Sequence, residues 1–384
     1  MIIGFDAKRA VNNMTGLGNY SRLIIERLAK EYSVNKLLLY TPAMRQNPRL
    51  SAIKAQTNVE FRLPPPQGFH GSLWRTFGIS NNLKADGVEI FHGLSNELPL
   101  NIKKAGIPSV VTIHDLIYRT LPDCYKAIDR LIYDYKYGKS CHNADRIIAV
   151  SQRTKDDVVR FYGVDPDRID VIYQGCDESF RSTWSSDRLS ELRQRLGLPD
   201  RYILQVGTIE KRKNLEQTIR ALSALPHDIH LVAVGRDHHG YQPQMIKLAK
   251  ELGVINRITW LEGLDFKDLP GVNQAAEIIV YPSRYEGFGI PVVEGLESGR
   301  PVVAAKGSCL EEAGGANSIY VDPDSAHELS EALMALLTGT IDKEAMITAG
   351  KIHARRFDKK DMAGQIMACY EKTIEIHRSR DNIF

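Results

Sequence analysis

Two glutamates, Glu286 and Glu294, bracket a short segment whose residue types suit a phosphate site. Gly287 and Gly289 permit a tight loop after the first glutamate, and Pro291 fits the first turn of a helix, where its missing N–H group costs nothing. The N–H groups at the start of a helix lack partners within the helix, and the helix dipole favours an anion there. The segment therefore predicts a phosphate bound at a helix N-terminus between two carboxylates.

The start of this helix indicates which groups would contact the ligand. We expect outward-pointing backbone N–H groups around Ile290, Val292 and Val293. Glu294 falls in the first turn or so, and helical side chains lean back toward the N-terminus, so its carboxylate can accept from paired hydroxyls such as a ribose diol. Glu286 could meet a second polyol. Considered singly, each glutamate is explained at least as well by a charge exposed to solvent as by a ligand role. The glycines and the proline between them favour the ligand role.

A second candidate is a run of three cations, Lys211 to Lys213, between an apolar strand and a helix. Consecutive cations at a strand-to-helix turn suit a polyanion such as a diphosphate. A solvated basic loop is the plain alternative. Because open α/β sheets bind ligands at the carboxyl ends of parallel strands, and because this loop follows such a strand, we favour a ligand role for Arg212 and Lys213.

Short apolar runs alternate with amphipathic stretches along the chain, which predicts strands and helices in turn. The expected strands lie at 2–5, 36–40, 88–91, 109–113, 146–150, 170–173, 202–206, 230–234, 278–281 and 301–304. Strand–helix alternation indicates a doubly wound α/β fold. A polar stretch at about 177–200 breaks this rhythm. We therefore expect one domain at 1–178, a second at 179–358, and a terminal helix within 359–384.

The segment around the two glutamates, PSRYEGFGIPVVEGLESGRPVV, resembles the signature of glycosyltransferase family 4, whose members are retaining glycosyltransferases with the GT-B fold. The spacing of Glu286 and Glu294 is similar to that family's E-x7-E motif. The resemblance implies that Glu294 binds the donor ribose and that Glu286 lies at the transferred sugar. Gly295 stands where the family usually has alanine. Other residues that the resemblance assigns to the donor site are Phe288, Gly289, Ile290 and Val293.

Two further strings of the second domain are similar to elements of that family. Residues 207–214, GTIEKRKN, resemble its RKN element, which implies that Arg212 and Lys213 neutralise the donor diphosphate. Thr208, which we place in the donor site, stands where some relatives carry an additional arginine. The turn around Leu264 resembles the base-contact turn of the family, so its backbone is expected to read the nucleobase.

The first domain offers weaker candidates. Gly16 and Gly18 lie between the first strand and the first helix, where they could admit a ligand or serve the turn alone. The resemblance implies that this loop faces the donor phosphates and the acceptor. The resemblance also implies that His114 touches the donor sugar, with support from Asp115. From the sequence pattern alone, a purely structural role for His114 is the better interpretation. His92, at another strand end, is interpreted as an acceptor contact.

The resemblance implies a GT-B architecture, in which two Rossmann-like domains face each other across a cleft and the terminal helix crosses back to the first domain. The string TIHDL, 112–116, is similar to mannosyltransferases of surface-polysaccharide pathways, which favours GDP-mannose over UDP-linked hexoses as donor. A saccharide or lipid-linked acceptor is implied. A tyrosine-rich stretch, 116–137, fits either the acceptor groove or core packing. The alternatives are a GT-B-fold epimerase, a phosphorylase, or a non-catalytic nucleotide-sugar binding protein.

Composition excludes several classes of protein. A net charge of +3 without a dense basic run argues against a nucleic-acid partner. Five scattered cysteines fit reduced thiols, and neither they nor the adjacent His238 and His239 have metal spacing. The Asp-Pro-Asp strings at 165–167 and 322–324 are typical of turns. We expect no metal and no cofactor apart from the donor, and a cytoplasmic location that leaves peripheral membrane contact open.

Overall fold

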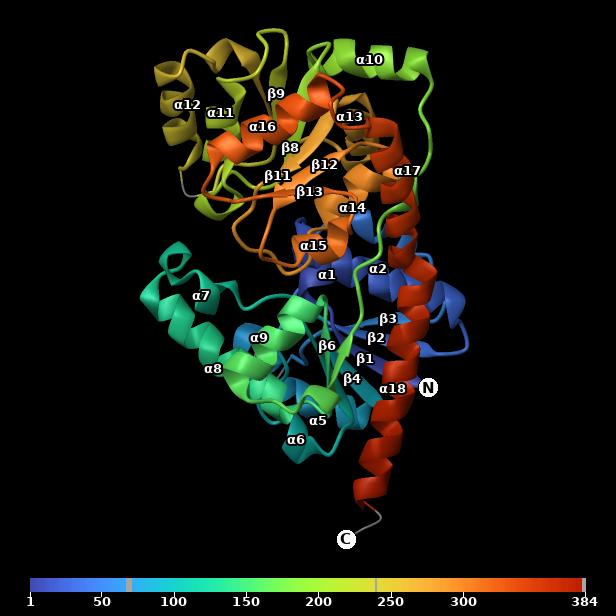
Figure 1. Ribbon diagram of the computed structural model, residues 1–384. Helices are drawn as coiled ribbons and strands as arrows, with labels where there is room; N and C mark the ends of the chain where they lie inside the picture. Colours follow the sequence, from blue (N-terminus) through green and yellow to red (C-terminus); the bar gives the residue numbers. More distant parts are fainter. Residues whose placement is uncertain (67–70, 239, 382–384) are drawn as a thin grey trace. The chain divides into compact units, whose positions relative to one another are not determined.

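The computed structural model describes residues 1–66, 71–238 and 240–381, which divide into two compact units (Figure 1). Unit 1 consists of Met1–Gln174 and Lys359–Phe384, and unit 2 consists of Gly175–Asp358. The sequence predicts the first boundary after residue 178, and in the structure it lies after residue 174. The C-terminal segment belongs to unit 1.

Unit 1 is built on a parallel sheet that has seven strands among the described residues, in the order β3-β2-β1-β4-β5-β6-β7. Its strands are β1 (Ile2–Asp6), β2 (Lys36–Tyr40), β3 (Val59–Arg62), β4 (Ile90–Gly93), β5 (Ser109–Ile113), β6 (Arg146–Ala149) and β7 (Ile169–Val171). The central strands are buried and apolar because helices flank the sheet. The strand order reverses between β1 and β4, the position at which doubly wound sheets bind ligands.

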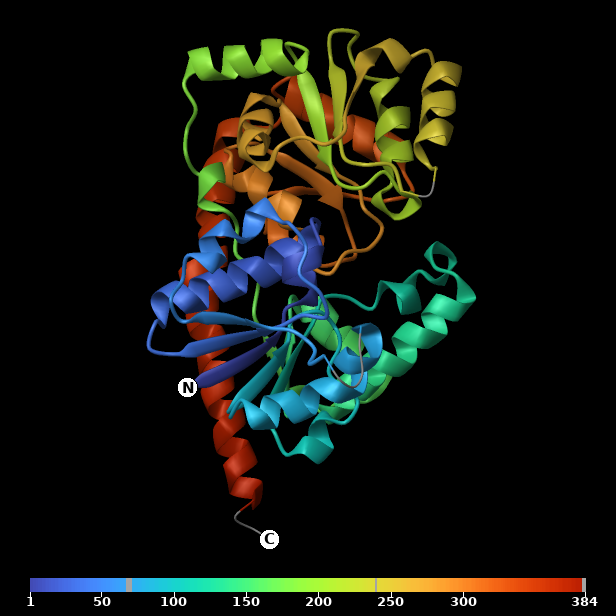
Figure 2. The ribbon, with the colours of Figure 1, turned by 180° about the vertical axis from the view of Figure 1, so that it is seen from behind.

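The helices of unit 1 come from both ends of the chain. They are α1 (Lys8–Asn12), α2 (Gly16–Glu31), α3 (Ser51–Lys54), α4 (Gly71–Leu73), α5 (Ile79–Ala85), α6 (Ile102–Ala105), α7 (Ile117–Thr120), α8 (Ala127–Asn143), α9 (Gln152–Tyr162) and α18 (Lys359–Asp381). The long terminal helix α18 packs against α2 and β5, as the view from behind shows (Figure 2). Its Tyr370 is fully buried, so the end of the chain completes the core of the first unit.

Unit 2 repeats this architecture with a parallel sheet of six strands among its described residues, in the order β10-β9-β8-β11-β12-β13. Its strands are β8 (Tyr202–Val206), β9 (His230–Val234), β10 (Ile258–Leu261), β11 (Ile278–Tyr281), β12 (Val302–Ala305) and β13 (Ile319–Val321). Its helices are α10 (Ser186–Leu196), α11 (Leu215–Leu222), α12 (Gln242–Glu251), α13 (Leu269–Ala275), α14 (Ile290–Glu297), α15 (Leu310–Gly314), α16 (Ala326–Leu337) and α17 (Lys343–Ala354). The strand order reverses between β8 and β11.

The predicted doubly wound α/β class is confirmed in both units, but three strands escaped prediction. These are β3, β10 and β13, and each is an edge strand of its sheet. Most of their residues are only half-buried, because an edge strand has a neighbour on one side only. The sequences of β3 and β10 accordingly interrupt their apolar residues with polar ones, and β13 is apolar but only 3 residues long, so none of them shows the extended apolar run of a central strand. Among the described residues, no helix combines the length and the apolar character that crossing a membrane would require.

Candidate functional site

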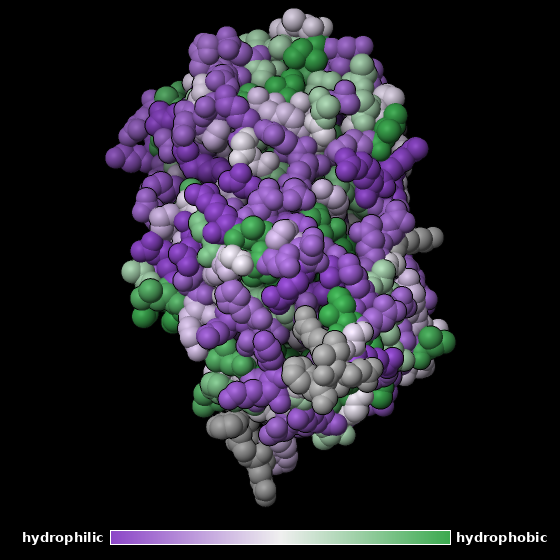
Figure 3. Space-filling model, turned by 60° about the horizontal axis from the view of Figure 1, so that its bottom comes forward, coloured by the Kyte–Doolittle hydropathy of each residue, from purple (hydrophilic) through white to green (hydrophobic). Residues whose placement is uncertain are grey.

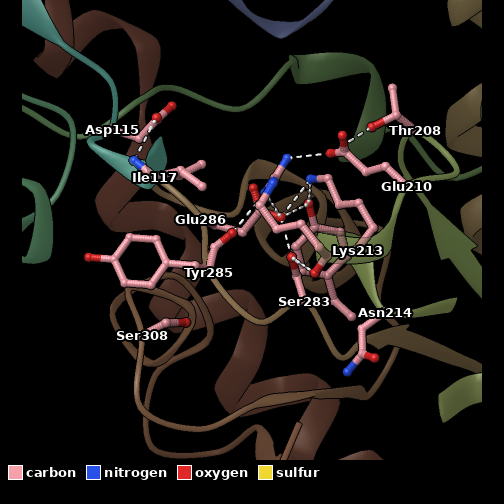
Figure 4. Close-up of polar contacts among 12 residues, drawn as sticks. Asp115, Ile117, Thr208, Glu210, Lys213, Asn214, Ser283, Tyr285, Glu286 and Ser308 are labelled. Carbon is pink, nitrogen blue, oxygen red and sulfur yellow. Dashed lines mark hydrogen bonds and ion pairs between the residues drawn. The ribbon is translucent and has the colours of Figure 1, made fainter. Parts of the chain in front are cut away.

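The two predicted ligand segments of unit 2 meet at the reversal of its strand order. The cation run follows β8, and the glutamate turn follows β11, and these are the two strands on either side of the reversal. In a parallel sheet, the loops that follow the strands all lie at the same edge. At the reversal, the loops after these two strands run in opposite directions, which leaves room for a ligand between them. Figure 4 shows side chains from both segments pointing toward one another.

Hydrogen bonds fix the cation run in place. Lys211–Lys213 forms one 3-10 turn, and Asn214 then adopts a left-handed conformation with φ of 60°. The Asn214 side-chain amide donates to the carbonyl oxygens of Pro282 (3.0 Å) and Pro323 (2.5 Å), which ties this turn to the segments that follow β11 and β13. Asparagine tolerates such a backbone conformation better than most residues. The asparagine of the RKN string therefore has a structural role, which the sequence analysis did not assign.

Both predicted cations bind the first glutamate. Glu286 Oε1 lies 2.7 Å from Arg212 Nη1 and 2.6 Å from Lys213 Nζ. The same oxygen accepts hydrogen bonds from the hydroxyls of Ser283 and Tyr281 (Figure 4). Burial alone would raise the pKa of Glu286, but the charges of the two cations outweigh it and lower that pKa to about 2. Glu286 is therefore ionised at neutral pH, and these contacts all use one of its two oxygens.

Arg212 has a second carboxylate partner that the sequence analysis missed. Its Nη2 donates to Glu210 Oε1 at 2.6 Å, and Thr208 Oγ1 donates to the same oxygen at 3.1 Å. Burial favours the neutral form of Arg212, yet the charges of Glu286 and Glu210 hold its pKa above the usual value. Burial also lowers the pKa of Lys213, against the charge of Glu286. Two cations are thus balanced by two carboxylates before any ligand binds.

The helix after the glutamate turn has the geometry expected of an anion site, with one exception. Gly289 precedes α14 with φ of 103°, and a Cβ there would lie 2.5 Å from Leu310 Cδ2, so only glycine fits. Pro291 lies in the first turn, as predicted. The expectation of an outward N–H group at Val292 is wrong, because this group donates to the Gly289 carbonyl at 2.9 Å. A tight first turn of this kind satisfies one of the N–H groups that a helix start would otherwise leave open.

Glu294 lies one full turn into α14, slightly later than the sequence suggested. It is buried, at 8% exposure, and no hydrogen bond or ion pair joins its carboxylate to another residue that the structure describes. Burial raises the pKa of Glu294 to about 8, with a smaller contribution from the charge of Asp177. A buried carboxyl group without a protein partner is costly unless a ligand supplies one.

The other predicted donor contacts occupy ends of neighbouring strands. Thr208 follows β8, and Leu264 lies in the turn after β10. Gly235 follows β9 and passes so close to the backbone of Gly207 that a Cβ would lie 1.8 Å from the Gly207 carbonyl oxygen. The polar-loop interpretation of the histidine pair cannot be followed to His239, which lies outside the described residues.

His114 in unit 1 is a neutral imidazole with one nitrogen available. Its Nε2 lies 2.9 Å from the Leu94 carbonyl oxygen, which can only accept, so Nε2 carries the proton and Nδ1 is the acceptor. Burial lowers the pKa of His114 to about 4. The ring packs edge-on against Tyr20 at 4.6 Å between centroids. Asp115 Oδ1 accepts from the Ile117 N–H at 3.2 Å at the start of α7.

The interpretation of His92 as an acceptor contact is wrong. The side chain is fully buried, with Nδ1 2.6 Å from Tyr370 Oη and Nε2 2.8 Å from Thr112 Oγ1. Both ring nitrogens are thus used inside unit 1, where they fasten α18 to the central strands. Burial lowers the pKa of His92 to about 3, so the ring is neutral. From sequence alone a histidine at a strand end resembles a catalytic residue, because no neighbouring residue indicates that its partner is Tyr370 of α18.

The two glycines of the first domain differ in role. They lie in the first turn of α2 rather than in a free loop. Gly18 is buried, its N–H is 3.3 Å from Asn13 Oδ1, and a Cβ would lie 2.0 Å from the Asn13 carbonyl oxygen. Close packing therefore explains Gly18 without a ligand. Gly16 is exposed at the start of α2, and a Cβ there would meet no atom within 4 Å.

The Asp-Pro-Asp strings form turns, as predicted. Asp165 Oδ1 accepts from the Asp167 N–H at 2.9 Å, and Asp322 Oδ1 accepts from the Asp324 N–H at 2.9 Å. No group of three or more histidine, cysteine, aspartate or glutamate side chains in the described part of the chain is arranged to hold a metal ion.

Comparison with known families gives matches in both halves of the chain. Residues 190–353 match the family described as Glycosyl transferases group 1, and residues 14–180 match Glycosyltransferase Family 4. The two glutamates and both cations lie within the first of these matches, and His114 lies within the second.

Individual relatives match over most of their length. The O-antigen chain mannosyltransferase B of Escherichia coli is 26% identical over 381 residues, which cover 93% of this chain and 96% of the relative. The D-inositol 3-phosphate glycosyltransferase 1 of Catenulispora acidiphila is 30% identical over 350 residues, which cover 83% and 81%. The crystal structure of Anabaena HepE in complex with UDP-glucose superposes with a TM-score of 0.76 at 22% identity, and covers 97% of this chain and 99% of that one. This last likeness establishes the fold.

Proposed function

Because the chain belongs to the group 1 glycosyltransferases, with a family 4 N-terminal half, we propose that it transfers a hexose, preferably mannose, from a nucleoside-diphosphate sugar to a saccharide or lipid-linked acceptor of surface-polysaccharide synthesis. The preference for mannose, and hence for GDP-mannose, is supported by the E. coli O-antigen mannosyltransferase, which aligns with nearly the whole chain. A UDP-linked hexose is the alternative donor. The family resemblance supports transfer with retention at the anomeric carbon.

The observation that carries this proposal is the pairing of two cations with a helix start at the reversal of the unit 2 sheet. Arg212 and Lys213 follow β8, and α14 begins directly after the loop that follows β11. A diphosphate bound there would accept from both cations and from the start of α14. Backbone of Gly289, Ile290 and Val293 and the side chains of Thr208 and Phe288 would complete the pocket, and the turn at Leu264 would contact the base.

The leaving group is stabilised by charge rather than by a covalent step. Arg212 and Lys213 are already held in place by Glu286 and Glu210, so little reorganisation is needed when negative charge develops on the departing diphosphate. Glu286 uses Oε1 for both cations, which leaves Oε2 to accept from a hydroxyl of the transferred sugar.

The remaining roles are assigned to groups that still have hydrogen-bonding capacity among the described residues. Glu294, buried and unpartnered among the described residues, accepts from the ribose hydroxyls. His114 offers Nδ1 as an acceptor to a sugar hydroxyl, because its Nε2 proton is committed to the Leu94 carbonyl. Gly16 supplies an exposed backbone position at the start of α2 for the donor phosphates or the acceptor.

Turnover with a panel of nucleotide sugars tests the proposal. We expect thermal stabilisation by the true donor, since a ligand bound only by the native state raises Tm, and release of free nucleoside diphosphate only when an acceptor is present. Release of an epimerised donor, or sugar 1-phosphate formation with inorganic phosphate, would support an epimerase or a phosphorylase. Tight donor binding without turnover on any acceptor would support a binding protein.

A further inference from the structure

An unusual backbone conformation marks one residue beside the reversal of the unit 1 sheet. Asn96 and Asn214 are the two non-glycine residues in the described ranges that have a positive φ, at 62° and 60°. Asn214 follows β8 in the candidate site of unit 2, and Asn96 follows β4, one of the two strands at the reversal in unit 1. Strained conformations of this kind persist where the surrounding structure enforces them, and they gather at ligand sites.

The burial of Asn96 makes it more informative than an exposed polar residue. Hydrophilic side chains cover most of the face shown in Figure 3, and hydrophobic ones form small separate groups, so exposed polar residues are too common to mark a site. Asn96 is only 5% exposed. Because buried polar groups are almost always hydrogen-bonded, the partners of Asn96 indicate what its strained conformation serves.

Asn96 holds the backbone at the point where the chain leaves β5. Its N–H group donates to the Thr112 carbonyl oxygen at 2.8 Å, and its Oδ1 accepts from the His114 N–H group at 2.7 Å. The left-handed conformation, which asparagine tolerates better than most residues, turns the N–H group and the side chain of one residue toward the same segment. These two hydrogen bonds fix the main chain of His114.

The remaining polar atoms of His114 are held by the same loop and by α9, with one exception. The Leu94 carbonyl oxygen accepts from Nε2 at 2.9 Å, and Thr154 Oγ1 donates to the His114 carbonyl oxygen at 3.1 Å. Within the described part of the chain, Nδ1 is thus the polar atom of His114 that has no partner. It is also the atom that the proposed function gives to a sugar hydroxyl, so its position depends on these three hydrogen bonds.

The tyrosine cluster of α7 and α8 holds Asn96 in turn. Burial raises the pKa of Tyr137, and a hydrogen bond with the Asn96 side chain opposes this rise. Tyr133 and Tyr137 stack at 5.5 Å between ring centroids, and both pack edge-on against Tyr118. These rings lie in or against the core of unit 1, so the core-packing interpretation of the tyrosine-rich stretch is confirmed for these three residues. Asn96 therefore rests on a packed support.

A turn-forming role alone does not explain an asparagine at this position. A turn that needed only a positive φ would be served better by glycine, which adopts it without steric cost. Asparagine keeps some strain but supplies the oxygen that accepts from the His114 N–H group. This oxygen is uncharged, so it does not counteract the burial that lowers the pKa of His114 to about 4, as a carboxylate would.

We propose that Asn96 is a positioning residue for sugar transfer, which holds His114 so that Nδ1 meets a hydroxyl of the donor sugar. This inference rests on the proposed function, because Asn96 acts through His114 and has no contact of its own with the donor.

A double-mutant cycle on donor binding tests the inference. The contribution of the sugar is measured as the ratio of the Kd of GDP to the Kd of GDP-mannose, because GDP lacks the transferred sugar. We expect H114A to lower this ratio about tenfold and N96G about fivefold, with the Kd of GDP unchanged. In the H114A background, N96G should change the ratio less than about twofold, because its effect passes through His114. UDP and UDP-glucose provide the same comparison if the donor is a UDP-linked hexose.

The variants separate positioning from folding. Glycine adopts a φ of 62° freely, so N96G should keep the fold. The control N101A removes two side-chain hydrogen bonds elsewhere in unit 1, so it should lower Tm and keep the wild-type Kd ratio.

The possible failures are distinguishable. An unchanged ratio in N96G beside a lowered ratio in H114A would overturn this inference and leave the proposed function standing. An effect of N96G that is equally large in both backgrounds, or an equal loss in N101A, would also overturn it. An unchanged ratio in H114A would refute the proposed role of His114, and this inference with it.

Discussion

Donor binding should release a proton if Glu294 binds the ribose as proposed, because burial keeps this carboxyl protonated in the free protein at neutral pH. Burial raises the pKa of this carboxyl to about 8. A protonated carboxyl accepts through its carbonyl oxygen only, since its second oxygen has become a donor, so a ribose diol that donates two hydrogen bonds favours the ionised form. The proposed role of Glu294 therefore links donor affinity to pH, and the direction is set: affinity falls as pH decreases.

The size of the effect follows from the pKa. At pH 7 a group with a pKa of about 8 is roughly nine-tenths protonated, so each donor bound should release close to one proton. The apparent Kd should rise by about fiftyfold between pH 8 and pH 6, provided that the pKa in the complex lies below this range. His114 and His92 do not interfere, because burial lowers their pKa values to about 4 and about 3.

Calorimetric titration in two buffers of different ionisation enthalpy measures the released proton directly. GDP-mannose is the appropriate ligand, because the terminal phosphate of free GDP itself titrates near pH 6. Glu294→Gln is the matched control, since it keeps the shape of the side chain but cannot titrate. It should bind more weakly at pH 8 and with the same affinity at pH 6 and pH 8. A wild-type affinity that is flat across this range, with no proton released, would refute the ribose role of Glu294.

Three further predictions concern neighbouring residues. Between about pH 4.5 and pH 8 the folded state holds a proton on Glu294 that the unfolded state has lost. The free energy of unfolding should therefore fall with rising pH by up to about 5 kcal/mol more in the wild type than in E294Q. Parallel curves of unfolding free energy against pH for the two proteins would contradict this. E286Q removes the carboxylate that competes for the two cations, so it should bind GDP about tenfold more tightly while sugar transfer slows, and weaker GDP binding would be the contrary result. G295A places a Cβ 2.8 Å from Ile279 Cγ1 and should destabilise unit 2 by about 1 kcal/mol in urea unfolding. In the control G364A the Cβ would meet only the Tyr32 hydroxyl, at an ordinary contact distance of 3.7 Å, so this variant should stabilise unit 1 by about 0.5–1 kcal/mol. Equal effects of the two substitutions would contradict the packing argument.

Sequence patterns were sufficient for the central strands and for the turns that bring the two candidate segments of unit 2 together. Continuous apolar runs predicted β1, β2 and β8 because both faces of those strands are buried. The turn chemistry at Gly289 and Pro291 predicted the start of α14, since a positive φ and a missing N–H are local properties. Local sequence rules therefore predicted where β8 and β11, the two strands that precede the candidate segments, end.

Features that depend on distant partners could not be predicted. Nothing near His92 in sequence indicates that Tyr370 donates to or accepts from it, and nothing near Gly18 indicates the approach of the Asn13 carbonyl. The ion pair between Arg212 and Glu210 could not be predicted either. Two opposite charges two residues apart in a loop do not show from sequence alone whether their side chains meet. Gly295, which departs from the family pattern, is explained only by its close packing on β11.

The central claim is that Arg212 and Lys213 hold the diphosphate of the donor. The most direct test compares the Kd values of GDP and guanosine at pH 8 for the wild type, for K213Q and for the control K211Q, which alters the exposed neighbouring lysine. We expect K213Q to lower the preference for GDP at least about tenfold without changing guanosine affinity, and K211Q to retain the wild-type preference. An unchanged preference in K213Q, or equal weakening of both ligands, would contradict the account.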